Sequence, residues 1–251
     1  MAIHRTKVKN AFTLLELLVV VGCIGLLTAL ALPLLGRARS NSAEAACMNN
    51  LGNLDRAFLT YSDQNQGLVP QEGNIGKLIS DPVNAAAWYN VAVQPEYPAM
   101  TNLYNSGNYP LPGNGSVYSC PLATMPISPS KSYAFFMYGE NDFICVNASD
   151  IALGAPQTRI NLVTRPSQTI YIGEVLATPS SPSLSGVTAN YAAIRHNGFG
   201  MFAMTDGSVQ MFTTNEFNHN YSGPASEWFA NGVSGAFTNR ACYWWPTPNT
   251  P

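Results

Sequence analysis

Residues 12–35 form an almost continuous apolar run that contains a single charged residue, Glu16. As one α-helix, this run measures roughly 36 Å, which exceeds the ~30 Å hydrocarbon core of a bilayer. A carboxylate inside a membrane helix costs roughly 2.5–3.5 kcal/mol on insertion scales. We therefore expect a membrane helix in which Glu16 has a specific partner.

A short basic leader, residues 1–11, precedes this run and carries Arg5, Lys7 and Lys9 without any acid. Such a leader holds the N-terminus of a membrane helix in the cytoplasm. The apolar run is too long for the core of a secretory signal peptide, and no small-x-small site follows it directly. An uncleaved signal anchor is the alternative to a processed leader.

Residues 9–16, KNAFTLLE, resemble the processing site of type IV pilins and type II secretion pseudopilins. The resemblance implies that a prepilin peptidase cuts between Ala11 and Phe12, and that Phe12 is then N-methylated. Glu16 takes the place of the family's signature glutamate, and Pro33 that of a helix-bending proline. The chain departs from the family at Ala11, because a glycine usually precedes the cut.

The resemblance gives Glu16 a role in assembly. Cleavage leaves a cationic amine on Phe12, which Glu16 of a neighbouring subunit can neutralise at low dielectric constant. Repeated contacts of this kind build open helical polymers. The implied partners are the prepilin peptidase, other pilin or pseudopilin subunits, an inner-membrane assembly platform with its ATPase, and membrane lipid. The chain would cross the inner membrane once with its head in the periplasm, and then enter a periplasmic or cell-surface filament.

An amphipathic half, residues 36–66, continues the same helix. Apolar side chains recur there at 4-3-4-3 spacing, from Cys47 to Tyr61, whereas Asp55 and Arg56 fall outside this stripe. Gly67 is the expected end of the helix. The predicted organisation is a cleaved leader (1–11), a transmembrane or filament-core helix (12–35), the amphipathic half (36–66) and an extracytoplasmic head (67–251).

Strands are expected in the second half of the chain, over residues 132–138, 143–146, 169–174, 200–203 and 208–212. The sequence Asp206-Gly207 between the last two predicts a hairpin. A short helix is expected over residues 81–91. The predicted fold is α+β and pilin-like, with the long N-terminal helix packed on an antiparallel sheet and with long loops.

A second resemblance covers residues 195–209, where His196 is followed by nine residues and then Asp206-Gly207. This is similar to the H-x9-D-G segment of a group of pilin-like proteins with long heads. Residues 47–51 (CMNNL) and 119–121 (SCP) resemble further hallmarks of that group. The resemblance implies no activity.

The composition argues against two functional classes. Charged residues make up 10% of the chain, against the usual ~25%, and no basic run is present, so nucleic acid is not an expected partner. Neither a G-x-S-x-G motif nor a phosphate-binding Gly-Lys motif occurs. We therefore expect no enzymatic activity and no catalytic residue.

Five cysteines are present. Cys23 lies in the apolar run, where it is expected to pack as an apolar residue. Two disulfides among Cys47, Cys120, Cys145 and Cys242 are possible in an oxidising compartment, with three pairings, and four unpaired thiols are possible where no oxidase system operates. A zinc site is the alternative, although no C-x-x-C pair exists.

Four residues are weak metal candidates in a chain for which we expect no metal. His196 and Asp206 could face each other and bind an ion, but a structural hydrogen bond is preferred. Glu140 and Asp142 offer oxygen ligands that suit calcium, without the spacing of an EF-hand.

The function that the sequence favours is that of a structural subunit of a type IV pilus-like or type II secretion pseudopilus filament. The alternative is a membrane-tethered extracytoplasmic module that binds a glycan or a surface partner and uses the helix as an anchor. Major pilin, minor pilin and pseudopilin remain undistinguished.

Overall fold

The computed structural model describes residues 13–73, 77–94, 96–125, 135–145, 157–176, 186–187, 191–217, 242 and 244. The predicted cleavage site at Ala11 and Phe12 lies outside these residues, as do residues 132–134 of the strand expected over 132–138 and most of the chain beyond residue 217. Contacts divide the chain into two compact units, Met1–Ser42 and Ala43–Pro251.

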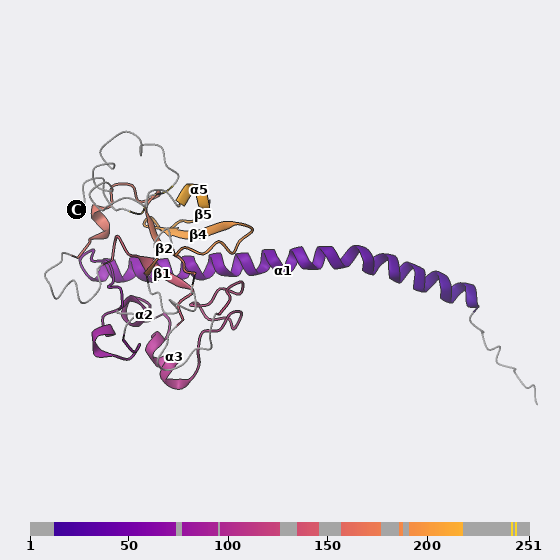
Figure 1. Ribbon diagram of the computed structural model, residues 1–251, viewed down its shortest axis with the longest axis horizontal. Helices are drawn as coiled ribbons and strands as arrows, with labels where there is room; N and C mark the ends of the chain where they lie inside the picture. Colours follow the sequence, from indigo (N-terminus) through magenta and orange to yellow (C-terminus); the bar gives the residue numbers. More distant parts are fainter. Residues whose placement is uncertain are drawn as a thin grey trace, which may run out of the picture. The chain divides into compact units, whose positions relative to one another are not determined.

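The longest element is helix α1 (Leu14–Gln64), which runs through Pro33 without interruption (Figure 1). It begins with a capping box: the Thr13 backbone N–H donates to Glu16 Oε2 at 2.9 Å, and the Glu16 N–H donates back to Thr13 Oγ1 at 3.3 Å. It ends where Gln66 and Gly67 adopt positive φ angles of 58° and 81°. Among the described residues, α1 is the one helix with the length and composition to cross a membrane.

Within the second unit, a five-stranded sheet has the strand order β3-β1-β2-β4-β5. Its strands are β1 (Tyr138–Asn141), β2 (Ile170–Glu174), β3 (Gly186–Val187), β4 (Phe199–Met204) and β5 (Val209–Thr213). All neighbouring strands are antiparallel except β1 and β3, which are parallel. The fold is α+β, as expected from the sequence.

The part of α1 in the second unit packs on one face of this sheet. Cys47, Leu51, Leu54 and Phe58 are fully buried and share a core with Tyr171 of β2 and with Met201 and Ala203 of β4. The Phe58 and Tyr171 rings meet edge to face at 5.4 Å. These four helix residues belong to the predicted stripe, so the stripe faces the sheet core.

A loop-rich layer with short helices contributes to the same core. It includes η1 (Pro82–Asn84), α2 (Trp88–Val91) and α3 (Met100–Ser106). The first two lie where a single helix was expected over 81–91. The Trp88 ring lies 5.3 Å from Phe58, and Tyr89 and Tyr104 are buried in the same cluster. A further turn, η2 (Ile160–Leu162), lies between β1 and β2 in the chain.

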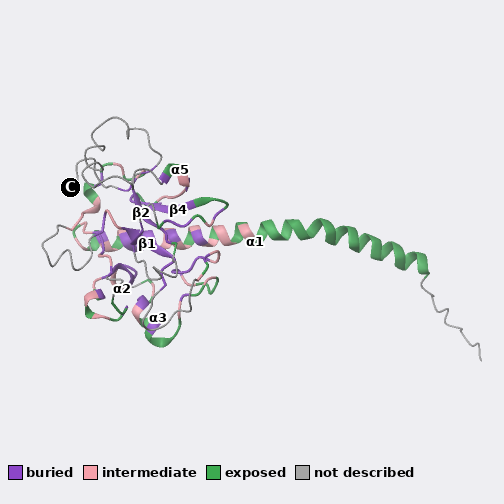
Figure 2. Ribbon diagram, in the orientation of Figure 1, coloured by how far each residue is buried: buried purple, intermediate pink, exposed green. Residues whose placement is uncertain are grey.

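The opposite face of the sheet has its own core. Phe202 of β4 packs against Phe217, in helix α5 (Thr214–Phe217), and against Trp244. Asn141 at the end of β1 donates from Nδ2 to the carbonyls of Ile170 and Trp244, each at 2.7 Å. Both faces of the sheet are therefore covered, and the buried residues in Figure 2 concentrate around it.

The positions of β2, β4 and β5 agree with the sequence expectation, whereas that of β1 differs. β2, β4 and β5 match the predicted runs, and Gly207 has φ +92° in the β4–β5 turn. β1, in contrast, begins only at Tyr138, and residues 143 and 144 form a turn instead of the expected strand. The Ile144 N–H and the Cys145 N–H both donate to the Asn141 carbonyl, so the chain turns where a strand was expected to begin.

Candidate functional site

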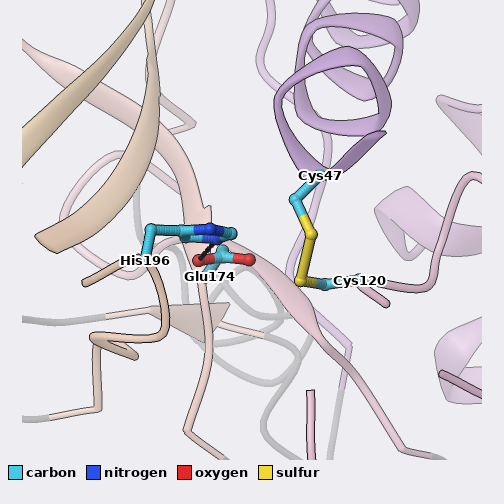
Figure 3. Close-up of side chains that lie close together, drawn as sticks. All are labelled: Cys47, Cys120, Glu174 and His196. Atoms are coloured by element: carbon cyan, nitrogen blue, oxygen red, sulfur yellow. Dashed lines mark ion pairs between the residues drawn. A yellow bond between two sulfur atoms is a disulfide. The ribbon is translucent and has the colours of Figure 1, made fainter. Parts of the chain in front are cut away.

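The most concentrated polar cluster in the described residues surrounds the disulfide Cys47–Cys120, which joins α1 to the loop layer with Cα atoms 4.9 Å apart. Glu174 and His196 complete this cluster, and a ligand atom from each of the four residues lies within 4.8 Å of the others (Figure 3). All four side chains are buried. We call these four residues the disulfide cluster.

Backbone pairing brings Glu174 and His196 together. The chain after β3 returns alongside the end of β2, where the Ala193 N–H donates to the Glu174 carbonyl at 2.8 Å. His196 and Phe199 then pair across a tight turn whose central residues, Asn197 and Gly198, have φ angles of 53° and 90°. Asn-Gly is the preferred sequence for such a turn, because both positions require positive φ.

The imidazole and the carboxylate approach closely without forming a hydrogen bond. His196 Nε2 lies 2.8 Å from Glu174 Oε2, yet neither ring nitrogen and neither carboxylate oxygen has a hydrogen-bond partner in the described structure. The contact is a buried ion pair in which the ring nitrogen and the carboxylate are not aligned as hydrogen-bond donor and acceptor (Figure 3). Unsatisfied polar atoms at this depth are costly.

One cation lies beside the cluster. The Arg195 guanidinium is 3.6 Å from Glu174 Oε1 and also donates to the carbonyls of Val175 and Met137. Burial lowers the pKa of Arg195, and the negative charge of Glu174 opposes that shift. Glu174 therefore has a compensating charge within the protein interior, as a buried carboxylate requires.

The His196–Asp206 pair that the sequence suggested does not form. The two residues lie before and after β4, a six-residue strand about 20 Å long, so their side chains are held at opposite ends. Asp206 Oδ1 instead accepts hydrogen bonds from the Ser208 backbone N–H at 3.0 Å and from its hydroxyl at 2.7 Å. Asp206 thus has the turn role that its position before Gly207 favoured, and His196 faces Glu174.

The two ends of the H-x9-D-G segment both meet α1. His196 lies in the disulfide cluster with Cys47, while Gly207 lies against Asp55 and Leu59 further along the helix. Asp55 is fully buried, contrary to the expectation that it falls outside the packed stripe. Burial, and then the nearby Asp206 carboxylate, raises the pKa of Asp55 to about 8.

The other two metal candidates lie in a separate acidic cluster. Asp142 groups with Glu72 and Cys145, whose ligand atoms lie within 4.8 Å of one another. Glu140 is fully buried nearby, and burial, followed by Glu72 and Asp142, raises its pKa well above the ordinary range. Burial also raises the pKa of Asp142, to about 7.

Among the four head cysteines, the described structure forms one of the possible disulfides, Cys47–Cys120. Cys145 is buried beside the acidic cluster, whereas Cys242 lies in the core on the other face of the sheet. The Cys242 thiol donates to the Glu216 carbonyl at 3.7 Å. Cys145 and Cys242 therefore lie in different surroundings.

Sequence reasoning missed Glu174, Glu72 and Arg195. Glu174 carried a usable signal, since it is an acid at the end of an otherwise apolar strand. Glu72 had no such signal, because it comes near Asp142 only through the tertiary fold. Comparison with protein families, curated proteins and solved structures gave no match to this chain.

The architecture itself supports the first resemblance at a coarse level. A long apolar N-terminal helix packed on a largely antiparallel sheet is a pilin-like arrangement. An apolar helix in this position is of the kind that serves as a membrane anchor or signal sequence.

Proposed function

We propose that this chain is a structural subunit of a type IV pilus-like or type II secretion pseudopilus filament, processed by a prepilin peptidase. The observation that carries the proposal is the exposure of α1 in the first unit. Its leucine, valine and isoleucine side chains from Leu14 to Leu35 are exposed all round the helix. A surface of this size and apolarity requires lipid or neighbouring subunits to cover it.

Glu16 favours a filament over a simple anchor. An anchor gains nothing from an acid in its apolar helix, whereas a filament can use that acid to recognise the amine of a neighbouring Phe12. Thr13 holds the carboxylate in place, because its N–H and its hydroxyl both donate to Glu16 Oε2, at 2.9 and 2.7 Å. In this proposal the head is structural and has no enzymatic activity.

Mass spectrometry of the N-terminus of the native protein tests the proposal. The expected mature chain begins with N-methylated Phe12, and an Ala11→Glu variant keeps its leader because a large acid replaces a small residue before the cut. Purified surface or periplasmic filaments should contain the mature chain. A native chain that still begins at Met1 would contradict the proposal. Cleavage without any filament would favour the membrane-tethered binding module instead.

A further inference from the structure

We propose that the disulfide cluster is a zinc site when its cysteines are reduced, with Cys47, Cys120, Glu174 and His196 as the four ligands. The inference is independent of the filament function. It rests on the geometry in Figure 3, where an imidazole and a carboxylate lie beside two sulfur atoms in the protein interior. The imidazole nitrogens and the carboxylate oxygens lack a hydrogen-bond partner in the described structure, so their lone pairs are available to a metal ion.

The donor set suits zinc. Two thiolates, an imidazole and a carboxylate are the ligand types that Zn²⁺ binds in tetrahedral sites, whereas calcium and magnesium take oxygen ligands. Metal–ligand distances of about 2.0–2.3 Å place neighbouring ligand atoms roughly 3.5 Å apart. The four ligand atoms already lie within 4.8 Å of one another. Once the sulfur–sulfur bond is broken, small side-chain movements that separate the two sulfur atoms, and His196 Nε2 from Glu174 Oε2, give this spacing.

The orientation of His196 and Glu174 supports the same conclusion. Their nearest atoms are 2.8 Å apart but make no hydrogen bond, and Arg195, 3.6 Å from Glu174 Oε1, balances the charge of the carboxylate. Two ligands of one metal point in this way, because each directs a lone pair at the ion and not at the other ligand.

The disulfide form and the zinc form of the cluster carry the same charge. In the disulfide form, the buried charges of Glu174 and Arg195 cancel. A dithiol reductant supplies two electrons and two protons: the Cys47–Cys120 bond breaks, two S–H groups form, and the reductant closes its own disulfide. Zn²⁺ then displaces the two thiol protons to solvent. One dication replaces two protons, so the buried charge is unchanged, and Arg195 balances the anionic site.

Zinc and the disulfide therefore exclude each other at these two cysteines. A chain that binds zinc before oxidation keeps α1 and the loop layer joined through the metal. A chain that is oxidised first keeps them joined through the disulfide. In both cases the link between α1 and the loop layer runs through Cys47 and Cys120.

The test uses the full-length chain in detergent micelles, in its disulfide form and after reduction with excess dithiol and desalting under argon. We expect the reduced chain to bind one Zn²⁺ and release two protons, and the disulfide form to bind none. Cobalt in place of zinc should give the thiolate charge-transfer absorption of a tetrahedral site. A reduced chain that binds no metal overturns the proposal.

Matched variants identify the ligands. Glu174→Gln and His196→Gln should each lower zinc affinity by more than about 100-fold, and Arg195→Met, which changes only a neighbour of the site, by roughly 10–100-fold. Cys145→Ser is the control, because Cys145 belongs to the acidic cluster, and it should bind zinc like the wild type. Loss of zinc in Cys145→Ser, or wild-type affinity in both Gln variants, contradicts the assignment.

X-ray absorption at the zinc edge keeps the proposal testable if a variant does not fold. The reduced wild-type chain should show two sulfur and two nitrogen or oxygen neighbours around zinc. A shell with one sulfur, as the acidic cluster would provide, or with none, rules out the disulfide cluster as the site.

Discussion

The two parts of α1 differ in how their apolar residues are covered. From Leu14 to Leu35 the apolar side chains surround the helix and are exposed, whereas from Cys47 onwards they form one stripe that is buried in the head. A stripe is what a helix needs to pack on one sheet, and an apolar surface on every side is what a helix needs among lipids or other helices. One continuous helix thus meets two different environments.

Two acids, one from each part of α1, lie in opposite surroundings. Glu16 is exposed and accepts hydrogen bonds from Thr13. Asp55 is buried, has no hydrogen-bond partner among the described residues and lies near Asp206. The first environment stabilises a carboxylate that is ready to meet a cation, and the second favours the protonated acid.

The largest expected effect comes from Glu16. Glu16→Gln should abolish incorporation into filaments while leaving cleavage intact, because glutamine preserves the capping box but removes the charge that the Phe12 amine requires. Filament yield and N-terminal mass spectrometry measure the two outcomes. Glu44→Gln, the same change further along α1, is the matched control. Normal incorporation of Glu16→Gln would show that Glu16 acts only as a helix cap.

A second test concerns Asp55, whose pKa is raised from 3.8 to about 8. Between these values the unfolded chain has lost the proton and the folded chain retains it, so the free energy of unfolding should fall as pH rises and level off above about pH 8. The full change is on the order of 5 kcal/mol. Asp55→Asn should remove this part of the pH dependence and stabilise the head in alkaline solution.

Near-ultraviolet circular dichroism of the head aromatics, recorded during denaturant unfolding at several pH values, measures this difference. Asp63→Asn is the control, since Asp63 is exposed on the same helix. Burial also raises the pKa of Asp142, so part of the decline with pH should persist in Asp55→Asn. An identical slope in the wild type and in Asp55→Asn would contradict the raised pKa.

Packing gives the next largest effect. Phe58 lies between Trp88 and Tyr171, so Phe58→Ala should lower the free energy of unfolding of the head by about 3–5 kcal/mol. Leu26→Ala should leave head unfolding unchanged, because Leu26 is exposed in the first unit. Equal destabilisation by both variants would mean that the two parts of α1 unfold together.

The smallest effect is expected at α5, which repeats the Thr-x-x-Glu sequence found at the start of α1. The Thr213 N–H and hydroxyl donate to Glu216 Oε2 at 2.7 and 2.8 Å. Glu216→Ala should cost about 1 kcal/mol, and Glu216→Gln much less, because glutamine can still accept these bonds. Thermal unfolding measures both. If Glu216→Gln keeps its stability while Glu16→Gln is not incorporated into filaments, then the role of Glu16 in charge pairing is distinct from helix capping.

Local patterns predicted the parts of the fold that depend on local physics. The extent of α1, the β4–β5 hairpin at Asp206-Gly207 and the α+β class follow from periodicity and turn chemistry. The first strand was predicted to begin before Tyr138, where β1 begins. An aromatic run has the composition of a strand even when its residues are buried without pairing to a neighbouring strand. Phe135 and Phe136 are such residues, buried but outside any strand.

Three of the four residues of the candidate site were recognised from the sequence, but their grouping was not. Cys47, Cys120 and His196 were recognised, but their common partner Glu174 reaches them through long-range strand pairing, which spacing alone does not reveal. Asp55 was misplaced for a similar reason: the helical pattern describes one buried stripe, whereas the tip of the β4–β5 hairpin covers a second strip of the same helix.

The nine residues between His196 and Asp206 set the distance between two contacts that this segment makes with α1. They include β4, with the His196 imidazole near Cys47 before the strand and the Gly207 turn near Asp55 after it. Removing a single residue would invert the alternation of side chains and send Met201 and Ala203 to the wrong face. The fold therefore constrains the length of this segment, because both of its ends contact α1.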